Sequence, residues 1–115
     1  DAVASRYGVR MQGADELALT KLDVLSYMDK IPVCVAYDVD GERVEDFPSG
    51  ERLRVAKPIF EYFDGWKCDI NHCRKEEDLP VQAREYIAAV EKMVGCPITY
   101  VSVGAERDEY IVRNK

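Results

Sequence analysis

The feature that most constrains the fold is a helical pattern of apolar residues that stops just before a β-branched run. Six apolar residues recur at three- and four-residue spacing, as on one face of a helix: Ala83, Tyr86, Ile87, Val90, Met93 and Val94. Asp78 can cap the start of this helix, and Pro80 fits its first turn. Gly95 and Pro97 end it. Residues 98–103, which are rich in β-branched side chains, then predict a strand, so this helix should pack against a sheet.

The rest of the chain is predicted to form one further helix and several strands. Apolar residues four apart predict a helix over Ala2–Gln12, ended by Gly13. Further strands are predicted at residues 17–19, 31–37, 42–47, 57–63 and 110–112. The second of these is apolar on both faces, as in a strand buried between layers. Asp40 and Gly41 suit a tight hairpin turn, and residues 66–77 form a polar loop. This order indicates an α/β or α+β sheet with helices packed on it, and we predict the α/β class.

Composition sets limits on domain count and on partners. With 115 residues, 47% of them apolar, the chain can bury one modest core, so we expect one domain or a piece of one. Sixteen basic residues are interleaved with twenty-two acidic ones, which argues against a nucleic-acid-binding surface. No run approaches the roughly 20 apolar residues of a membrane span, and residues 1–6 lack signal-peptide anatomy. We therefore expect a cytoplasmic protein, and because Asp1 is not Met, a start created by processing or cutting.

Cysteine and histidine give only a weak metal signal. The four cysteines, Cys34, Cys68, Cys73 and Cys96, are scattered and are predicted to be free thiols. Cys68, His72 and Cys73 could offer zinc ligands, but a second matching pair is lacking, so an ordinary loop is the simpler interpretation. His72 is predicted to be a surface residue, and Trp66 a packing anchor at the edge of the core. The acids of residues 38–46 do not have calcium-loop spacing and fit a solvated hairpin tip.

Two short turns, residues 20–23 and 102–104, follow directly on apolar strands, and ligands of α/β sheets bind at the carboxyl ends of strands. Lys21 and Asp23 are two positions apart, so their side chains leave the same side of the backbone. A carboxylate there can accept hydrogen bonds from guanine N1 and N2, which adenine cannot offer, while the lysine stem covers the base. The alternative is a solvated turn with a surface ion pair. No glycine-rich phosphate loop accompanies the motif.

A resemblance to a known family extends along nearly the whole chain. Residues 18–25, followed by residues 33–37 and by Asp40-Gly41, resemble the adenylosuccinate synthetase family. Six later segments resemble its C-terminal region in the same order: residues 58–61, 65–66, 78–80, 83–87, 95–98 and 101–104. The resemblance implies that residues 1–115 are a single C-terminal fragment without an internal boundary. It also implies a portion of a larger mixed sheet with helices packed on it, in a P-loop-GTPase-like synthetase fold.

The family condenses IMP with L-aspartate, using GTP and Mg²⁺, to give adenylosuccinate, GDP and phosphate in AMP biosynthesis. The resemblance assigns the guanine base of GTP to two sets of residues, Lys21, Leu22 and Asp23 in the first turn and Ser102, Val103 and Gly104 in the second. Catalytic residues, magnesium ligands and the contacts to IMP and aspartate lie upstream of this chain in the family. The fragment is therefore expected to be inactive alone, to need the N-terminal remainder of the enzyme, and to belong to a homodimer.

The second turn departs from the family pattern. Where the family continues Ser-Thr-Gly-Pro-Asp, this chain has Val103, Ala105 and Glu106 in place of Thr, Pro and Asp. If the turn acts through backbone groups the pocket survives, but a lost hydroxyl contact would cost about 0.5–1.5 kcal/mol of affinity. The alternative function is a stand-alone interaction or regulatory module that kept the fold without catalysis. A melting temperature that nucleotide does not change would favour that alternative.

Overall fold

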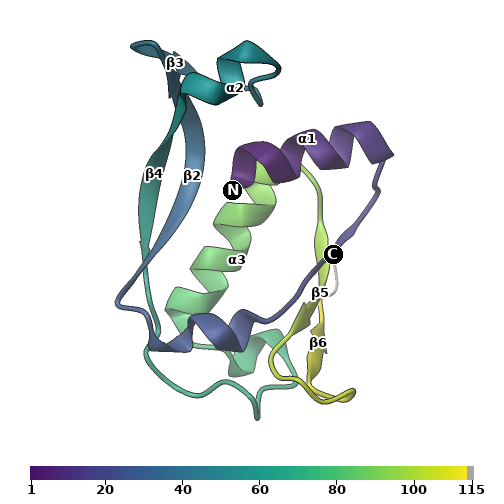
Figure 1. Cartoon of the computed structure of the whole chain (residues 1–115). Helices are drawn as coiled ribbons and strands as arrows, with labels where there is room; N and C mark the ends of the chain where they lie inside the picture. The colour runs from purple at the N-terminus through teal and green to yellow at the C-terminus, as the bar shows by residue number, and fades with distance from the viewer. Residues whose placement is uncertain (114–115) are drawn as a thin grey trace.

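The computed structural model describes residues 1–113. Its elements, in chain order, are α1 (Ala2–Gln12), β1 (Leu17–Leu19), the 3₁₀ helix η1 (Leu22–Tyr27), β2 (Lys30–Val39), β3 (Glu42–Val44), α2 (Glu51–Val55), β4 (Ala56–Asp64), the 3₁₀ helix η2 (Glu76–Asp78), α3 (Val81–Val94), β5 (Ile98–Ser102) and β6 (Tyr110–Val112). Within these residues the strands form two three-stranded sheets, ordered β1-β5-β6 and β3-β2-β4. Figure 1 shows α3 between the two sheets, with α1 crossing one end of α3.

The predicted α/β class is confirmed, with a refinement of the sheet. The mixed sheet is β1-β5-β6, in which β1 runs parallel to β5 and β6 runs antiparallel to it. The hairpin strands do not join this sheet, because β2, β3 and β4 form a separate antiparallel one. Strand patterns in a sequence predict strands but not their partners, so this division was not foreseen.

Both long helices lie where their apolar spacing predicts them. Gly13, at φ 63° and ψ 37°, ends α1, and Gly95, at φ 74° and ψ 30°, ends α3. The predicted cap of α3 is wrong. Pro80 occupies the cap position, and no side chain bonds the first turn of α3. Asp78 instead ends η2, and its carboxylate accepts hydrogen bonds from the backbone N–H groups of Arg74 and Lys75, each at 3.2 Å.

The long strand β2 has one face toward the core and one toward solvent, not two buried faces as predicted. Its register with β4 shifts between Cys34 and Ala36, both of which are buried. On the outer face Pro32 is exposed beside Tyr62, which is 62% exposed, and Phe60, which is 45% exposed. Two features explain why β2 is apolar at consecutive positions. A bulge interrupts the alternation of its side chains, and its outer face lies beside exposed aromatic residues of β4.

The hairpin between β2 and β3 is confirmed, and three short helices, η1, α2 and η2, were missed. Asp40 and Gly41 both have positive φ, 52° and 87°, and the Asp38 carboxylate accepts a 2.7 Å hydrogen bond from the Gly41 N–H. The returning strand is shorter than the predicted residues 42–47. Neither η1 nor α2 has a side-chain cap at its start, so the sequence carried no capping signal for either.

One core cluster joins both ends of the chain. Its buried members are Leu22, Ile31, Trp66, Ile70, Cys73, Leu79, Ala83, Ile87, Ile98, Val101, Val103 and Ile111. Trp66 is 6% exposed, which confirms its prediction as a packing anchor, and His72 is exposed as predicted. All four cysteines are free. Among residues 1–113, no helix has the length and apolar character that a membrane crossing requires.

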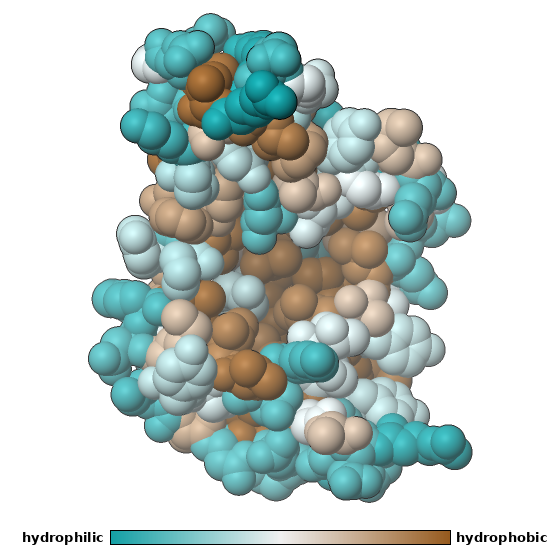
Figure 2. Space-filling model, viewed as in Figure 1, coloured by the Kyte–Doolittle hydropathy of each residue, from teal (hydrophilic) through white to brown (hydrophobic). Residues whose placement is uncertain are grey.

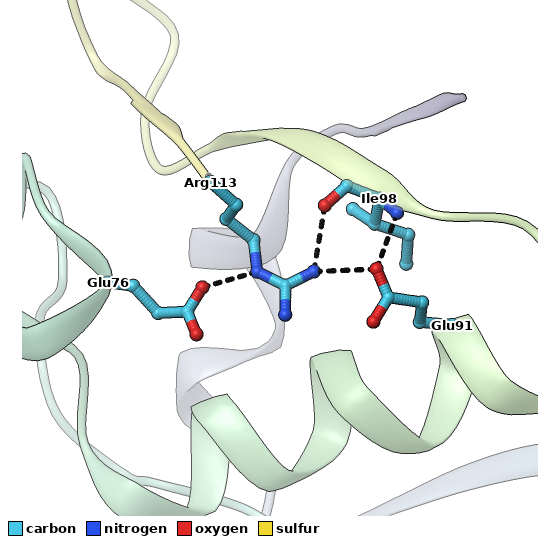
Figure 3. Close-up of polar contacts among 4 residues, drawn as sticks. All are labelled: Glu76, Glu91, Ile98 and Arg113. Carbon is cyan, nitrogen blue, oxygen red and sulfur yellow. Dashed lines mark hydrogen bonds and ion pairs between the residues drawn. The ribbon is translucent and has the colours of Figure 1, made fainter. Parts of the chain in front are cut away.

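A buried arginine links four elements near the C-terminal end of the described chain (Figure 3). The side chain of Arg113 is 4% exposed, and its guanidinium donates to the Ile98 carbonyl at 2.7 Å and to Glu91 at 3.0 Å. It also pairs with the Glu76 carboxylate, and the Ile98 N–H donates to Glu91 at 2.7 Å. Sequence reasoning did not predict this network, because isolated acidic residues and an arginine near the end of a chain normally indicate solvated charges.

An apolar groove of about 320 Å³ lies beside β1. Its apolar lining comes from α1, β1, α3 and β5 and includes Val9, Leu17, Leu19, Val90, Val94 and Ile98. Figure 2 shows apolar side chains gathered in this hollow on the face of the molecule drawn in Figure 1. Since β1 is an edge strand of its sheet, the groove lies next to unpaired backbone groups of that edge.

Candidate functional site

The two predicted turns lie side by side. β1 and β5 are parallel neighbours, with Leu19 opposite Val101. The turns that follow these two strands therefore both leave the sheet at the carboxyl ends of the strands. A direct bond joins the turns, since the Lys21 backbone N–H donates to the Ser102 hydroxyl oxygen at 2.7 Å. Residues 81 positions apart in sequence are thereby brought into contact. Open α/β sheets bind their ligands at the carboxyl ends of their strands.

Lys21 shapes the first turn. It has a left-handed backbone conformation, φ 60° and ψ 37°, which is uncommon for a residue other than glycine and redirects the chain from β1 into η1. Leu22 is 1% exposed and anchors the turn in the core, so its side chain is not available to a ligand. Asp23 follows in the first turn of η1 and is partly exposed. The turn thus pairs one buried anchor with two accessible charged side chains.

The charged groups of the first turn have no partners within residues 1–113. Neither the Asp23 carboxylate nor the Lys21 ammonium makes a salt bridge or a side-chain hydrogen bond there. The surface ion pair that the alternative interpretation expected is therefore not formed between them. The Asp23 carboxylate keeps its full capacity to accept hydrogen bonds, and the long lysine stem remains free to cover an apolar surface.

Val103 holds the second turn through all of its groups. Its side chain is fully buried in the core cluster. Its N–H donates to the Glu109 carbonyl at 2.9 Å, and its carbonyl accepts a 2.6 Å hydrogen bond from the side-chain amide of Asn71. A side chain at this position faces the core, so a hydroxyl in place of a valine methyl would be buried with it. The departure from the family pattern at Val103 therefore removes no ligand-facing group.

Gly104 supplies the first unbonded donor after β5. In the described part of the chain its N–H makes no hydrogen bond, in contrast to the N–H of Val103. A Cβ atom at Gly104 would lie 2.4 Å from the Glu109 carboxylate, which accepts a 2.9 Å hydrogen bond from the Glu106 N–H. Glycine thus lets Glu109 close the turn. The Ser102 hydroxyl, which accepts from Lys21, retains its own proton to donate.

Several residues that shape the site were missed by sequence reasoning. Trp66 donates from its indole N–H to the Ser26 hydroxyl of η1 at 2.8 Å, and Asn71 bonds Val103 as described above. Asn71 comes from the segment predicted only to be a polar loop, and Trp66 was predicted to be a packing anchor but not to bond η1. The Gly65-Trp66 pair was a signal, but no local pattern indicated which elements the loop would contact.

The possible zinc ligands do not form a metal site. Cys68 is exposed, whereas Cys73 is fully buried and donates to the Asp78 carbonyl at 3.3 Å. Burial raises the pKa of the Cys73 thiol, and the nearby charges of Asp78 and Cys68 raise it further, which disfavours the thiolate that a metal needs. Within residues 1–113 no three His, Cys, Asp or Glu side chains gather as a metal site.

The fold and the paired turns define the class of protein, which is an α/β protein with two bonded turns at the carboxyl ends of adjacent parallel strands, where we place the candidate site. The sequence profile described as adenylosuccinate synthetase matches residues 1–111. Adenylosuccinate synthetase from Cyanothece sp. is 52% identical over 97% of this chain and 25% of its own length. The enzyme from Kineococcus radiotolerans is 48% identical over 99% of this chain and 27% of its own length.

A solved structure gives the same result. The structure of fully ligated adenylosuccinate synthetase from Plasmodium falciparum superposes with a TM-score of 0.88 at 36% identity, covering 95% of this chain and 27% of that one. The chain belongs to the adenylosuccinate synthetase family. It spans about a quarter of the length of the curated relatives it matches.

Proposed function

We propose that this chain supplies guanine recognition to an adenylosuccinate synthetase, the ligase that joins IMP to L-aspartate at the expense of GTP. One observation carries the proposal. The 2.7 Å hydrogen bond from the Lys21 N–H to Ser102 ties the turn that bears the unpaired Asp23 carboxylate to the turn that bears the unbonded Gly104 N–H. An acceptor and a donor without protein partners are thus presented at one edge of the sheet.

This pair of groups is complementary to guanine. The Asp23 carboxylate can accept hydrogen bonds from guanine N1–H and from the exocyclic 2-amino group, while the Gly104 N–H can donate to the 6-oxo group. Adenine has an acceptor at N1 and an amino group at position 6, so it would face an acceptor with an acceptor and a donor with a donor. The exposed stem of Lys21 can cover the face of the base. Specificity would then come from mismatched pairs in adenine as well as matched pairs in guanine.

The remaining chemistry belongs to the larger protein. In the proposed reaction GTP phosphorylates the 6-oxygen of IMP, and the amine of L-aspartate displaces that phosphate to give adenylosuccinate. Magnesium would be held elsewhere, because residues 1–113 gather no three acidic, His or Cys side chains as a metal site. We therefore propose that the upstream part of a cytoplasmic, homodimeric synthetase provides the metal ligands and the sites for IMP and aspartate.

The apolar groove supports the proposal that this chain packs against the remainder of the enzyme. Its lining residues Leu17 and Leu19 belong to the edge strand β1, and Val90 and Val94 belong to α3. Burying such apolar surface is favourable, and an uncovered strand edge invites association. The N-terminal remainder of the synthetase is the proposed cover. Residues 1–113 alone would then bind guanine nucleotides weakly and catalyse nothing.

The test is an Asp23→Asn substitution in the full-length polypeptide that contains this chain. An amide can still accept from N1–H but donates toward position 2, so it should repel the guanine amino group and suit the 2-oxo group of xanthine. We expect kcat/KM for GTP to fall about 10- to 100-fold, from the loss of a hydrogen bond to a charged group. Activity with xanthosine triphosphate should rise.

Asp15→Asn is the matched control, since Asp15 is exposed and lies outside both turns. It should leave the preference between GTP and xanthosine triphosphate unchanged. An unchanged preference in Asp23→Asn would remove Asp23 from the site. If GDP also failed to raise the melting temperature of the full-length protein, the alternative of an interaction module without nucleotide binding would be favoured.

A further inference from the structure

One loop braces both turns of the proposed guanine site. We call residues Gly65–Asn71 the bracing loop. At its start the Trp66 indole N–H donates to Ser26 in η1, the helix that begins in the first turn. At its end the Asn71 side-chain amide donates to the Val103 carbonyl in the second turn at 2.6 Å. Between them Ile70 is fully buried in the core cluster.

Hydrogen bonds to both of its backbone groups hold Asn71 in place. Its N–H donates to the Asp69 carboxylate at 2.9 Å, and its carbonyl accepts a hydrogen bond from the Arg74 guanidinium. The Asn71 side chain is therefore attached to a fixed backbone before it reaches the second turn. A donor on a fixed backbone loses less conformational entropy when its bond forms, which strengthens its hold on Val103.

The bond to Val103 also orients the donor of Gly104. The Val103 carbonyl and the Gly104 N–H belong to the same peptide unit, which is planar and trans, so the two groups point in opposite directions. Fixing the carbonyl toward Asn71 therefore fixes the Gly104 N–H on the opposite side. Because glycine has wide backbone freedom, this peptide could turn over readily without such a bond.

We propose that Asn71 is a positioning residue, which, through the Val103 carbonyl, aims the Gly104 N–H at the 6-oxo group of the purine. This inference rests on the proposed function, because it concerns the same guanine site. Asn71 does not touch the nucleotide in this scheme. Its effect is to keep one peptide unit in the orientation that discriminates a 6-oxo group from a 6-amino group.

The experiment is Asn71→Asp in the full-length polypeptide, assayed with GTP as the varied substrate. The carboxylate is nearly isosteric with the amide but places an oxygen against the Val103 carbonyl, so the peptide should turn over. We expect KM for GTP to rise about tenfold, as for one lost hydrogen bond, while kcat and KM for IMP stay within about twofold. Asn71→Ser, whose side chain is too short to reach, is the second variant and should show the same split.

His72→Gln is the control, because His72 is the exposed neighbour and makes no bond to the second turn. It should leave KM for GTP unchanged. A purely structural role for Asn71 would lower the melting temperature and the fraction of active protein without raising KM for GTP, and that result would overturn the proposal. Should Asn71→Asp fail to fold, the same measurement on Asn71→Ser decides.

The parallel Asp23→Asn measurement separates the two proposals. If Asp23→Asn changes the preference for GTP and the Asn71 variants leave KM for GTP unchanged, the guanine site stands and the positioning role is refuted. If Asp23→Asn leaves the preference unchanged, the guanine site fails, and the role of Asn71 in it fails with it. A raised KM for GTP in both Asn71 variants, together with a changed preference in Asp23→Asn, supports both.

Discussion

Replacing Arg113 with Met tests the most buried charge of the described chain. Methionine fills a similar volume but cannot donate, so Arg113→Met removes the bonds to the Ile98 carbonyl and to the Glu91 and Glu76 carboxylates. The side chain of Glu91 is only 16% exposed, whereas that of Glu76 is 38% exposed. The variant therefore removes the Arg113 cation from one carboxylate that is largely buried and from a second that water can reach.

The size of the effect follows from this difference in burial. Removing one partner of a buried ion pair costs about 3–5 kcal/mol of unfolding free energy. We expect the lower end, about 3 kcal/mol, because Glu91 still accepts the 2.7 Å bond from the Ile98 N–H. For a domain near 100 residues, about 4 °C of melting temperature corresponds to each kcal/mol, so the melting temperature should fall by about 12 °C. Glu76→Gln should cost about 0–1 kcal/mol, since that pair is partly exposed.

The assay is thermal and urea unfolding of the 115-residue chain, followed by circular dichroism. The double variant Arg113→Met, Glu91→Met should cost less than the sum of the two single variants, because it removes both members of the Arg113–Glu91 ion pair together. If Arg113→Met cost less than about 1 kcal/mol, or no more than Glu76→Gln, the network would not stabilise the fold in the way its geometry indicates.

Three further predictions concern the loops around the site. Gly65→Ala should lower the melting temperature of the chain more than Gly104→Ala, because a Cβ atom at Gly65 lies 1.8 Å from a backbone oxygen, whereas at Gly104 it meets the movable Glu109 carboxylate. Similar losses in thermal unfolding would contradict this. Cys68 should react with iodoacetamide well before the buried Cys73, as peptide mapping by mass spectrometry can show. Burial raises the pKa of Cys73 in the folded chain, so its contribution to stability is full below about pH 8.5, the unfolded value, and declines above it. Urea midpoints at pH 7 and 9.5 should show this decline, and a smaller one in Cys73→Val.

The elements of the fold could largely be predicted because each carries a local signal. The apolar face of α3 and the left-handed glycines Gly13 and Gly95 fix the two long helices, and positive φ at Asp40 and Gly41 fixes the hairpin. The pairing of β2 with β3 could be predicted from the turn between them, but the partners of the other strands could not. Side-chain alternation determines which face of a strand is buried but does not indicate the neighbouring strand. The separation of the hairpin strands from β1-β5-β6 therefore appeared only in three dimensions.

The cap of α3 shows why a local rule can fail. Asp78 has the right chemistry for a cap, but Leu79 is 3% exposed and belongs to the core cluster. Placing Leu79 in the core ends η2 at Asp78 and begins α3 only after Pro80. The burial of one leucine, worth about 2 kcal/mol, exceeds the roughly 1 kcal/mol that a cap contributes. Tertiary packing thus decided a boundary that propensity alone assigned otherwise.

The candidate site divides in the same way between local and tertiary information. Lys21 and Asp23 could be singled out because they are two positions apart in the chain and follow a strand, but the bond from Lys21 to Ser102 depends on β1 and β5 being parallel neighbours. The role of Asn71 is harder to predict from the sequence, because its amide reaches Val103 only when the bracing loop is anchored at both ends. A residue that contacts a ligand is often recognisable by its chemical type. A residue that positions another is recognisable only by the bond that it makes. For this reason Lys21 and Asp23 could be singled out from the sequence, and Asn71 could not.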